Sequence, residues 1–312
     1  MNRLRAAVVV RNVIAFVRLG RFKFLAGGFV LYGLGAAVAA RHHALDVRGY
    51  VWGQAAVAST QLMTHYANDY FDIAADRANT TPTQWSGGSR VLADGTLSPG
   101  VALAAARALG AVALLLSIAT AVVAHSARAL VVLLLALVLA WSYSAPPMRL
   151  HTRGVGAPSV ALVVGILTPL AGWLVQGGDA IEEMLVVAAP IAFAIAAMIL
   201  VIDFPDAEGD RAVGKRTPVV RFGPRVAARL AILCVLGAYA SLAMFPLVDV
   251  PSSALYAVAA TLPLGLWLVA RLVRGDGERT TAWEGLARTG VAWLAAIVVL
   301  ELAAWVRLAG RT

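Results

Sequence analysis

The chain has 312 residues, of which 60% are hydrophobic and only 14% are charged. Soluble domains typically carry about 25% charged and about 45–50% apolar residues, so this composition excludes an ordinary soluble domain. The net charge of +9 would suggest nucleic-acid binding in a soluble protein, but membrane proteins gather Lys and Arg in their cytoplasmic loops. We therefore expect an integral membrane protein whose surroundings are the lipid bilayer and which binds no nucleic acid.

The predicted elements begin with a basic segment, residues 1–21, which we expect to be retained and to lie in the cytoplasm. A membrane-spanning helix needs about 20 mostly apolar residues. The spans predicted on this criterion are nine, at residues 22–41, 49–68, 100–124, 127–144, 157–176, 183–203, 226–246, 252–273 and 287–308. The fold class is therefore all-α, a polytopic membrane protein with about nine transmembrane helices in a single domain, residues 1–312.

The distribution of charge indicates the orientation of these spans. With the N-terminus in the cytoplasm, 21 Lys and Arg residues fall on the cytoplasmic side and five on the other. This asymmetry is the one that the positive-inside rule predicts for a protein of the plasma membrane. An acidic stretch follows spans two and six, and a basic loop follows spans four and eight, so we expect two related four-helix halves plus a ninth helix.

Six aspartates gather in the two acidic stretches, although the whole chain has only 17 acidic residues. With the asparagine that opens the first stretch, the residues are Asn68, Asp69, Asp72 and Asp76, and then Asp203, Asp206 and Asp210. In both stretches the aspartates are three and then four residues apart, a spacing that stacks three carboxylates on one face of a continuous helix. We predict that both stretches form such faces on the cytoplasmic side and that all seven residues are catalytic.

Carboxylates crowded in this way repel one another, so the pattern favours a bound cation. Aspartates without paired Cys or His suit a hard ion such as Mg²⁺, which prefers one or two carboxylates together with waters and substrate phosphates. Two Mg²⁺ ions held by the six aspartates would not balance the carboxylates and a bound diphosphate. Basic residues on the same predicted side are candidates for diphosphate binding, the alternative being that they only follow the positive-inside rule: Arg149, Arg153, Lys215 and Arg216.

The two acidic stretches resemble the paired aspartate motifs of the UbiA family of intramembrane prenyltransferases. The resemblance extends over nearly the whole chain and is greatest to the 1,4-dihydroxy-2-naphthoate branch. The segments that indicate this branch are residues 87–92, 143–150 and 214–217. The resemblance implies an enzyme that transfers a polyprenyl group from a polyprenyl diphosphate, with Mg²⁺, to an aromatic acceptor such as dihydroxynaphthoate or a related quinone precursor in menaquinone-type biosynthesis.

Several further side chains are candidates for the acceptor or for the allylic cation that forms when the diphosphate leaves. Arg21 is a candidate contact for an acceptor carboxylate, and the aromatic rings of Tyr70 and Tyr143 are candidates for stabilising the cation. Arg90 ends a polar, glycine-containing loop that we expect beside the metal site. Ser98-Pro99 then predicts the start of a helix, with the serine at the N-cap and the proline at the first helical position.

Two other functional classes use the same residues. A terpene cyclase of the same family would ionise the same diphosphate and close the cation on itself without an acceptor. A transporter or channel would use intramembrane carboxylates to coordinate ions, but such residues are expected near the middle of the membrane and these lie at span ends.

His65, on the predicted face of Asp69, is a further candidate metal ligand.

Overall fold

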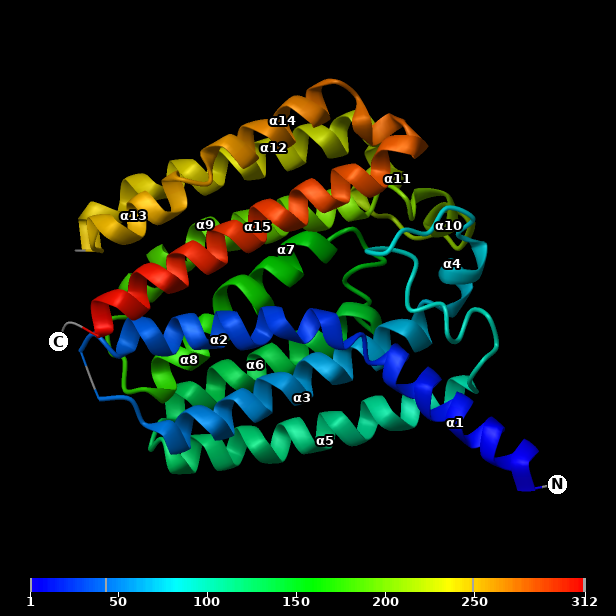
Figure 1. The fold of residues 1–312 in the computed structure, drawn as a ribbon, viewed down its shortest axis with the longest axis horizontal. Helices are drawn as coiled ribbons and strands as arrows, with labels where there is room; N and C mark the ends of the chain where they lie inside the picture. The colour runs from blue at the N-terminus through cyan, green and yellow to red at the C-terminus, as the bar shows by residue number, and fades with distance from the viewer. Residues whose placement is uncertain (1, 43, 249, 311–312) are drawn as a thin grey trace.

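The computed structural model describes residues 2–42, 44–248 and 250–310. These residues contain helices and loops and no strand, which confirms the all-α, polytopic fold class. In a bilayer every backbone polar group must be satisfied internally, and a long apolar segment achieves this as a helix. Figure 1 shows the long helices running side by side, with the N- and C-terminal ends at opposite ends of the bundle. Met1 of the expected basic segment and the C-terminal Arg311 and Thr312 lie outside the described residues.

The first half of the chain contains one helix for each expected span. A preceding helix, α1 (Asn2–Leu19), occupies most of the basic segment and projects from the end of the bundle (Figure 1). A short 3-10 turn, η1 (Phe22–Phe24), separates it from the first span. The spans are α2 (Leu25–Ala39), α3 (Val47–Phe71), α5 (Pro99–Val123) and α6 (Ala127–Ser144). Ser98 is the N-cap of α5 and Pro99 its first residue, as the sequence predicts.

The second half repeats this order with more irregular helices. The fifth span is divided into α7 (Gly156–Val160), a π-helical stretch η2 (Ala161–Leu167) and α8 (Thr168–Val175). The remaining spans are α9 (Ile181–Ile202), α12 (Pro224–Ala240) with the 3-10 segment η3 (Ser241–Val248), α13 (Ser252–Ala259) with α14 (Leu262–Val273), and α15 (Thr280–Ala309). Three short helices and a 3-10 turn lie in the loops: α4 (Ile73–Ala78), α10 (Ala207–Ala212), α11 (Pro218–Phe222) and η4 (Asp276–Glu278).

Eight segments within the described residues are long and apolar enough to cross a membrane. The first of these joins part of α1 to α2, and the second expected span, α3, is not among the eight. Polar residues such as Gln54, Gln61 and His65 lower the hydropathy of α3, although its 25 residues form one continuous helix. Because α3 packs against α2, α5, α6 and α8, these side chains face protein where they are buried, and a helix of this kind needs less apolar character than one surrounded by lipid.

Close packing of α2 against α8 depends on two glycines. A Cβ atom on Gly35 of α2 would lie 1.8 Å from the carbonyl oxygen of Pro169, and one on Gly172 of α8 would lie 2.1 Å from the carbonyl oxygen of Tyr32. Small residues at such contacts let two membrane helices approach until their backbones touch. The two glycines therefore fix the spacing between the first and second halves of the bundle.

We predict that Gly35→Ala lowers the stability of the detergent-solubilised protein, because the added methyl group collides with backbone that cannot move aside. Overpacking of this kind costs about 1–3 kcal/mol. The matched control is Gly27→Ala in the same helix, where nothing lies within 4 Å of the added Cβ. Thermal unfolding should show a lowered midpoint for Gly35→Ala and an unchanged or raised midpoint for Gly27→Ala; equal midpoints would contradict the assignment of this contact.

Candidate active site

The two acidic stretches lie at helix breaks, which corrects the expectation of three carboxylates on one continuous helical face. The helix α3 ends at Phe71, Asp72 is the residue between α3 and α4, and Asp76 lies in α4. In the second half Asp203 directly follows α9, Asp206 directly precedes α10, and Asp210 lies within α10. Carboxylates stacked on one helix would repel each other, and the breaks instead distribute them around the end of each helix.

Both breaks are brought together by the packing of α10 against α4. Gly209 of α10 lies so close to α4 that an added Cβ would be 2.7 Å from the carbonyl oxygen of Ala75 and 2.9 Å from the amide nitrogen of Asn79. The Asn79 side chain then donates a hydrogen bond across the interface to Asp206, with a distance of 2.6 Å. Figure 1 shows α4 and α10 side by side at the end of the bundle from which α1 projects.

A cavity lies at this junction and receives side chains from both acidic stretches. Its acidic and amide lining residues are Asn68, Asp72, Asp76, Asn79, Asp203, Asp206 and Asp210. Its other lining includes Arg21, Trp85, Tyr143, His151, Lys215 and, as apolar residues, Ile199 and Ile202. Five of the six predicted aspartates and Asn68 therefore face one cavity, although they come from positions about 130 residues apart in the sequence.

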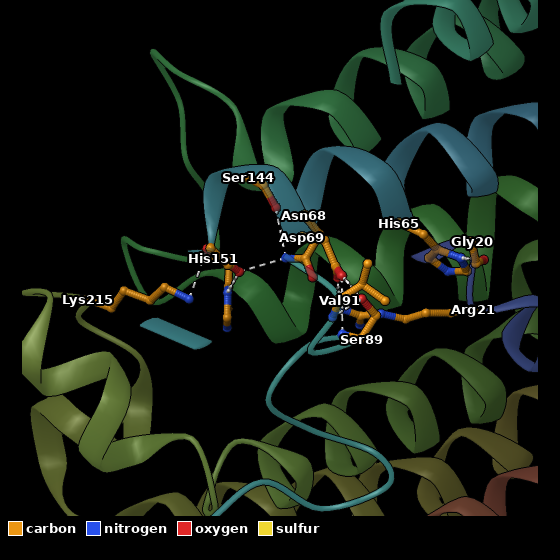
Figure 2. A network of polar contacts seen from close by, with 11 residues as sticks. Gly20, Arg21, His65, Asn68, Asp69, Ser89, Val91, Ser144, His151 and Lys215 are labelled. Atoms are coloured by element: carbon orange, nitrogen blue, oxygen red, sulfur yellow. Dashed lines mark hydrogen bonds and ion pairs between the residues drawn. The ribbon is translucent and has the colours of Figure 1, made fainter. Parts of the chain in front are cut away.

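Two cations lie at one side of this cavity. Lys215 Nζ is 3.1 Å from a carboxylate oxygen of Asp72 and 3.1 Å from one of Asp210, so it joins the two halves. The ring nitrogens of His151 lie 3.8 Å from oxygens of Asp72 and Asp203, beyond hydrogen-bond distance. Figure 2 shows Lys215 and His151 together on one side of Asn68 and Asp69, with Arg21 on the other side.

These charges shift the proton affinities of the cavity residues in opposite directions. Burial would lower the pKa of His151, but Asp203 and Asp72 raise it to about 10, so the ring is positively charged at neutral pH. Burial would raise the pKa of Asp72, but His151 and Lys215 hold it below its ordinary value. Burial and neighbouring carboxylates raise the pKa of Asp76 to about 7 and that of Asp206 to about 8. Asp76 and Asp206 are therefore the carboxylates for which the protein supplies too little positive charge.

Asp69 has protein partners of its own. It forms an ion pair with Arg21, and the Ser89 hydroxyl and backbone N–H both donate hydrogen bonds to it (Figure 2). Its neighbour Asn68 donates to Asp72 at 2.7 Å and to Ser144 at 3.1 Å. The beginning of the first stretch is thus held by Arg21, which pairs with Asp69, and by Ser144 of α6, which bonds to Asn68.

The remaining predicted residues divide between the cavity and its surroundings. Tyr143 lines the cavity, and its ring is stacked on His151 with centroids 5.1 Å apart. Tyr70 packs against Phe71 and is not a lining residue. Arg90 donates to the backbone carbonyl of Asp76, which holds the loop against α4. Three of the four predicted basic residues are exposed and absent from the lining: Arg149, Arg153 and Arg216.

Three residues at the site were not singled out by the sequence pattern. His151 and Asn79 contact the acidic stretches directly, and Trp85 contributes to the lining. His151 directly follows the segment 143–150, and this position was the only feature of the sequence that could have indicated it. His65, the candidate metal ligand, instead forms a hydrogen bond through Nδ1 with the carbonyl oxygen of Gly20, at 2.7 Å.

The chemistry of the lining fits Mg²⁺. Within the described residues no three His, Cys, Asp or Glu side chains converge closely enough to hold one ion by themselves. Mg²⁺ does not require this, because it is usually bound by one or two carboxylates together with waters and substrate phosphates. The buried Oδ2 of Asp210 has no hydrogen-bond partner, and a bare carboxylate oxygen beside Asp206 is a suitable ligand for such an ion.

The comparison with protein-family models decides the family. The model of the UbiA prenyltransferase family matches residues 29–285, which is most of the chain and includes both acidic stretches. The chain belongs to the UbiA family. The expected resemblance is thereby confirmed at the level of the family.

Curated UbiA-family relatives are similar over part of their length. A digeranylgeranylglyceryl phosphate synthase from Methanoregula boonei is 33% identical over 177 residues, covering 57% of this chain and 58% of the relative. A 2-carboxy-1,4-naphthoquinone phytyltransferase from Synechocystis sp. is 27% identical over 143 residues, covering 46% of this chain and 45% of the relative. The matches thus span about half of the length of these relatives, whose names indicate different reactions.

Solved structures of UbiA proteins share the fold over nearly the whole chain. The structure of a digeranylgeranylglyceryl phosphate synthase has a TM-score of 0.69 at 16% identity, covering 95% of this chain and 99% of that one. A UbiA homologue from Archaeoglobus fulgidus bound to DMAPP and Mg²⁺ has a TM-score of 0.58 at 17% identity, covering 91% and 99%. At these identities the likeness establishes the fold.

We predict that Lys215→Met destabilises the protein in metal-free detergent solution, because Asp72 and Asp210 lose the ammonium group between them. Removing one partner of a buried ion pair costs about 3–5 kcal/mol. Arg216→Met is the matched control, since Arg216 is exposed and surface substitutions usually change stability by less than about 0.5 kcal/mol. Thermal unfolding with EDTA present measures both variants, and a Lys215→Met midpoint equal to that of the control would refute the bridging role.

Proposed function

We propose that this protein transfers a polyprenyl group from a polyprenyl diphosphate to an aromatic acceptor, using Mg²⁺ bound between the two acidic stretches. The observation that carries the proposal is the single cavity lined by Asp72, Asp76, Asp203, Asp206 and Asp210 at the end of an apolar helical bundle. A soluble substrate would not need such a bundle, whereas a substrate with a diphosphate head and a hydrocarbon tail matches both environments.

The residues at the Lys215 side suit the diphosphate. Lys215 and the charged ring of His151 supply positive charge directly beside Asp72 and Asp210. Asp76 and Asp206, which form no ion pair within the described residues, are the carboxylates that we assign to the metal together with Asp210. Bound Mg²⁺ would neutralise the diphosphate as a leaving group. The A. fulgidus homologue was solved with DMAPP and Mg²⁺, which supports a prenyl diphosphate donor bound together with Mg²⁺.

The remaining lining suits the hydrocarbon part and the reaction. Ile199 and Ile202 of α9 offer an apolar start for the prenyl chain. The carbon–oxygen bond of the donor breaks with its electron pair on the diphosphate, and an electron-rich carbon of the acceptor forms the new carbon–carbon bond and loses its proton. The ring of Tyr143 lies at the cavity, where an aromatic face stabilises an allylic cation. The buried position of the site limits the access of water, which would otherwise capture that cation.

For the acceptor we propose 1,4-dihydroxy-2-naphthoate or a related quinone precursor, which would assign the protein to menaquinone-type biosynthesis. The naphthoquinone phytyltransferase among the relatives supports an acceptor of this class. Arg21 lies across the cavity from Lys215 and carries a donor group not used by Asp69, which suits the acceptor carboxylate. A cyclic terpene formed from the diphosphate alone, with no adduct when dihydroxynaphthoate is supplied, would instead identify a terpene cyclase.

We predict that Asp72→Asn and Asp206→Asn each lower kcat for prenyl transfer by about 100-fold or more, since Asp72 holds Lys215 beside the diphosphate and Asp206 is assigned to the metal. EDTA should abolish the activity of the wild-type protein and Mg²⁺ should restore it. Asp179→Asn is the control, because Asp179 is exposed just before α9 and pairs with Arg128 at the start of α6, whereas the site residues follow the other ends of these two helices. A product assay on lipid extracts measures all three, and full activity in both site variants would reject the assignment.

We also propose that the site faces the cytoplasm of a cell whose plasma membrane contains the protein, on the basis of the 21 to five division of basic residues. In a Cys234→Ala background, cysteines introduced at Thr80 and Ala212 should resist a membrane-impermeant thiol reagent in intact cells. A cysteine at Asp179, beyond the opposite ends of the helices, should react. The reverse labelling pattern would overturn the orientation without affecting the proposed chemistry.

A further inference from the structure

The side of the cavity that carries Arg21 contains two hydrogen-bond donors without a partner. Arg21 Nε and Trp85 Nε1 are both buried and make no hydrogen bond within the described protein. Both residues line the cavity. Buried polar groups are nearly always satisfied, so two orphaned donors at one cavity indicate a ligand that accepts hydrogen bonds.

Contacts on the indole ring hold Trp85 in place. The ammonium group of Lys23 lies 4.8 Å from the centroid of the ring, and the ring of Phe24 lies 6.2 Å away. Lys23 also donates to the carbonyl oxygen of Gln84 at 2.5 Å, and the Gln84 amide donates to Glu284 of α15 at 2.5 Å. The loop is therefore held both to the segment before α2 and to α15, and neither of these contacts uses the indole N–H.

Trp85 belongs to the Arg21 side of the cavity. Phe24, which packs against Trp85, also contacts the ring of His65, with centroids 6.0 Å apart. His65 in turn contacts the carbonyl oxygen of Gly20, the residue before Arg21. Figure 2 shows His65, Gly20 and Arg21 together, on the side of Asp69 opposite to Lys215 and His151. If the diphosphate lies against Lys215, the orphaned donors are left for the second substrate.

We infer that Trp85 determines acceptor specificity, its indole N–H acting with Arg21 Nε to hold an anionic oxygen of the acceptor. The inference rests on the proposed prenyl transfer and adds the residue that would select the acceptor. A guanidinium and an indole N–H only donate, so a group that only accepts, a carboxylate or a phosphate, satisfies both. The carboxylate of an aromatic acid and the phosphate of a prenylated glycerol phosphate share this chemistry.

The test is steady-state kinetics of Trp85→Phe, which keeps an aromatic ring between Lys23 and Phe24 and removes the N–H. Three acceptors are supplied with one prenyl diphosphate: 1,4-dihydroxy-2-naphthoate, 1,4-naphthohydroquinone without the carboxylate, and a prenylated glycerol phosphate. We expect the wild-type protein to prefer an anionic acceptor, and Trp85→Phe to raise the KM of that acceptor about tenfold, as loss of one hydrogen bond to a charged group implies. The KM of the donor and the kinetics with the neutral analogue should not change.

Two further variants separate specificity from packing. Trp85→His retains a ring N–H and should recover part of the preference for the anionic acceptor. Trp267→Phe, a tryptophan on the exposed surface of α14, should behave as wild type. An adduct with the naphthoate identifies the carboxylate as the bound group, and an adduct with the glycerol phosphate identifies the phosphate.

Other outcomes overturn the inference and remain distinct from a failure of the proposed function. Equal losses with the anionic and neutral acceptors in Trp85→Phe, or no change with either, would assign Trp85 to packing while prenyl transfer stands. A wild-type preference for the neutral analogue would likewise overturn the inference and leave prenyl transfer in place. No adduct with any acceptor in the wild-type protein would remove the proposed function itself, together with the acceptor subsite.

Discussion

The crowding of carboxylates where α4 meets α10 is the constraint on which the rest of the site depends. Gly209 allows the two short helices to touch backbone to backbone, and this contact places aspartates from both halves of the chain around one cavity. Such an arrangement is unfavourable without positive charge, because like charges in a partly buried site repel strongly. The neighbouring loops provide that charge: Lys215 after α10, His151 after α6, and Arg21 at the break between α1 and α2. The loops at this end of the bundle are thus organised by charge compensation, while the bundle itself is organised by apolar packing and by glycines such as Gly35.

The sequence predicts the bundle well because the membrane leaves few alternatives. An apolar run of about 20 residues can satisfy its backbone in lipid only as a helix, and the expected span 127–144 coincides with α6. The irregular spans were harder to foresee. The π-helical stretch η2 and the 3-10 segment η3 have the same apolar composition as the regular helices beside them, so composition and length do not reveal where a span changes its hydrogen-bond pattern. The polar residues of α3 lower its hydropathy for a reason that only packing explains, since they face other helices.

The candidate site was predictable in its acidic part and not in the groups that complete it. The doubled spacing of aspartates is a pattern, whereas His151, Asn79 and Trp85 are single residues in loops whose positions depend on tertiary contacts. The basic residues illustrate the same limit. Lys215 faces the cavity, but Arg149, Arg153 and Arg216 are exposed, and the positive-inside rule predicts a basic residue at a span end in either case. The helical spacing itself was misleading at Asp72, because a period of three and four residues also allows a helix to end between the aspartates.

The two sides of the cavity differ although the spacing of aspartates is repeated in the two acidic stretches. Asp69 and Asp203 occupy equivalent positions in the two stretches, but Asp69 is held by Arg21 and Ser89, whereas Asp203 faces His151. The partners come from elements that the repeat does not duplicate: Arg21 from the break after α1, and Ser89 from the long loop between α4 and α5. A symmetric pair of acidic stretches, by itself, would offer two equivalent ends to any substrate. The unequal partners leave Lys215 and His151 at one end of the cavity and Arg21 with Trp85 at the other, and a reaction between two different substrates requires such a difference.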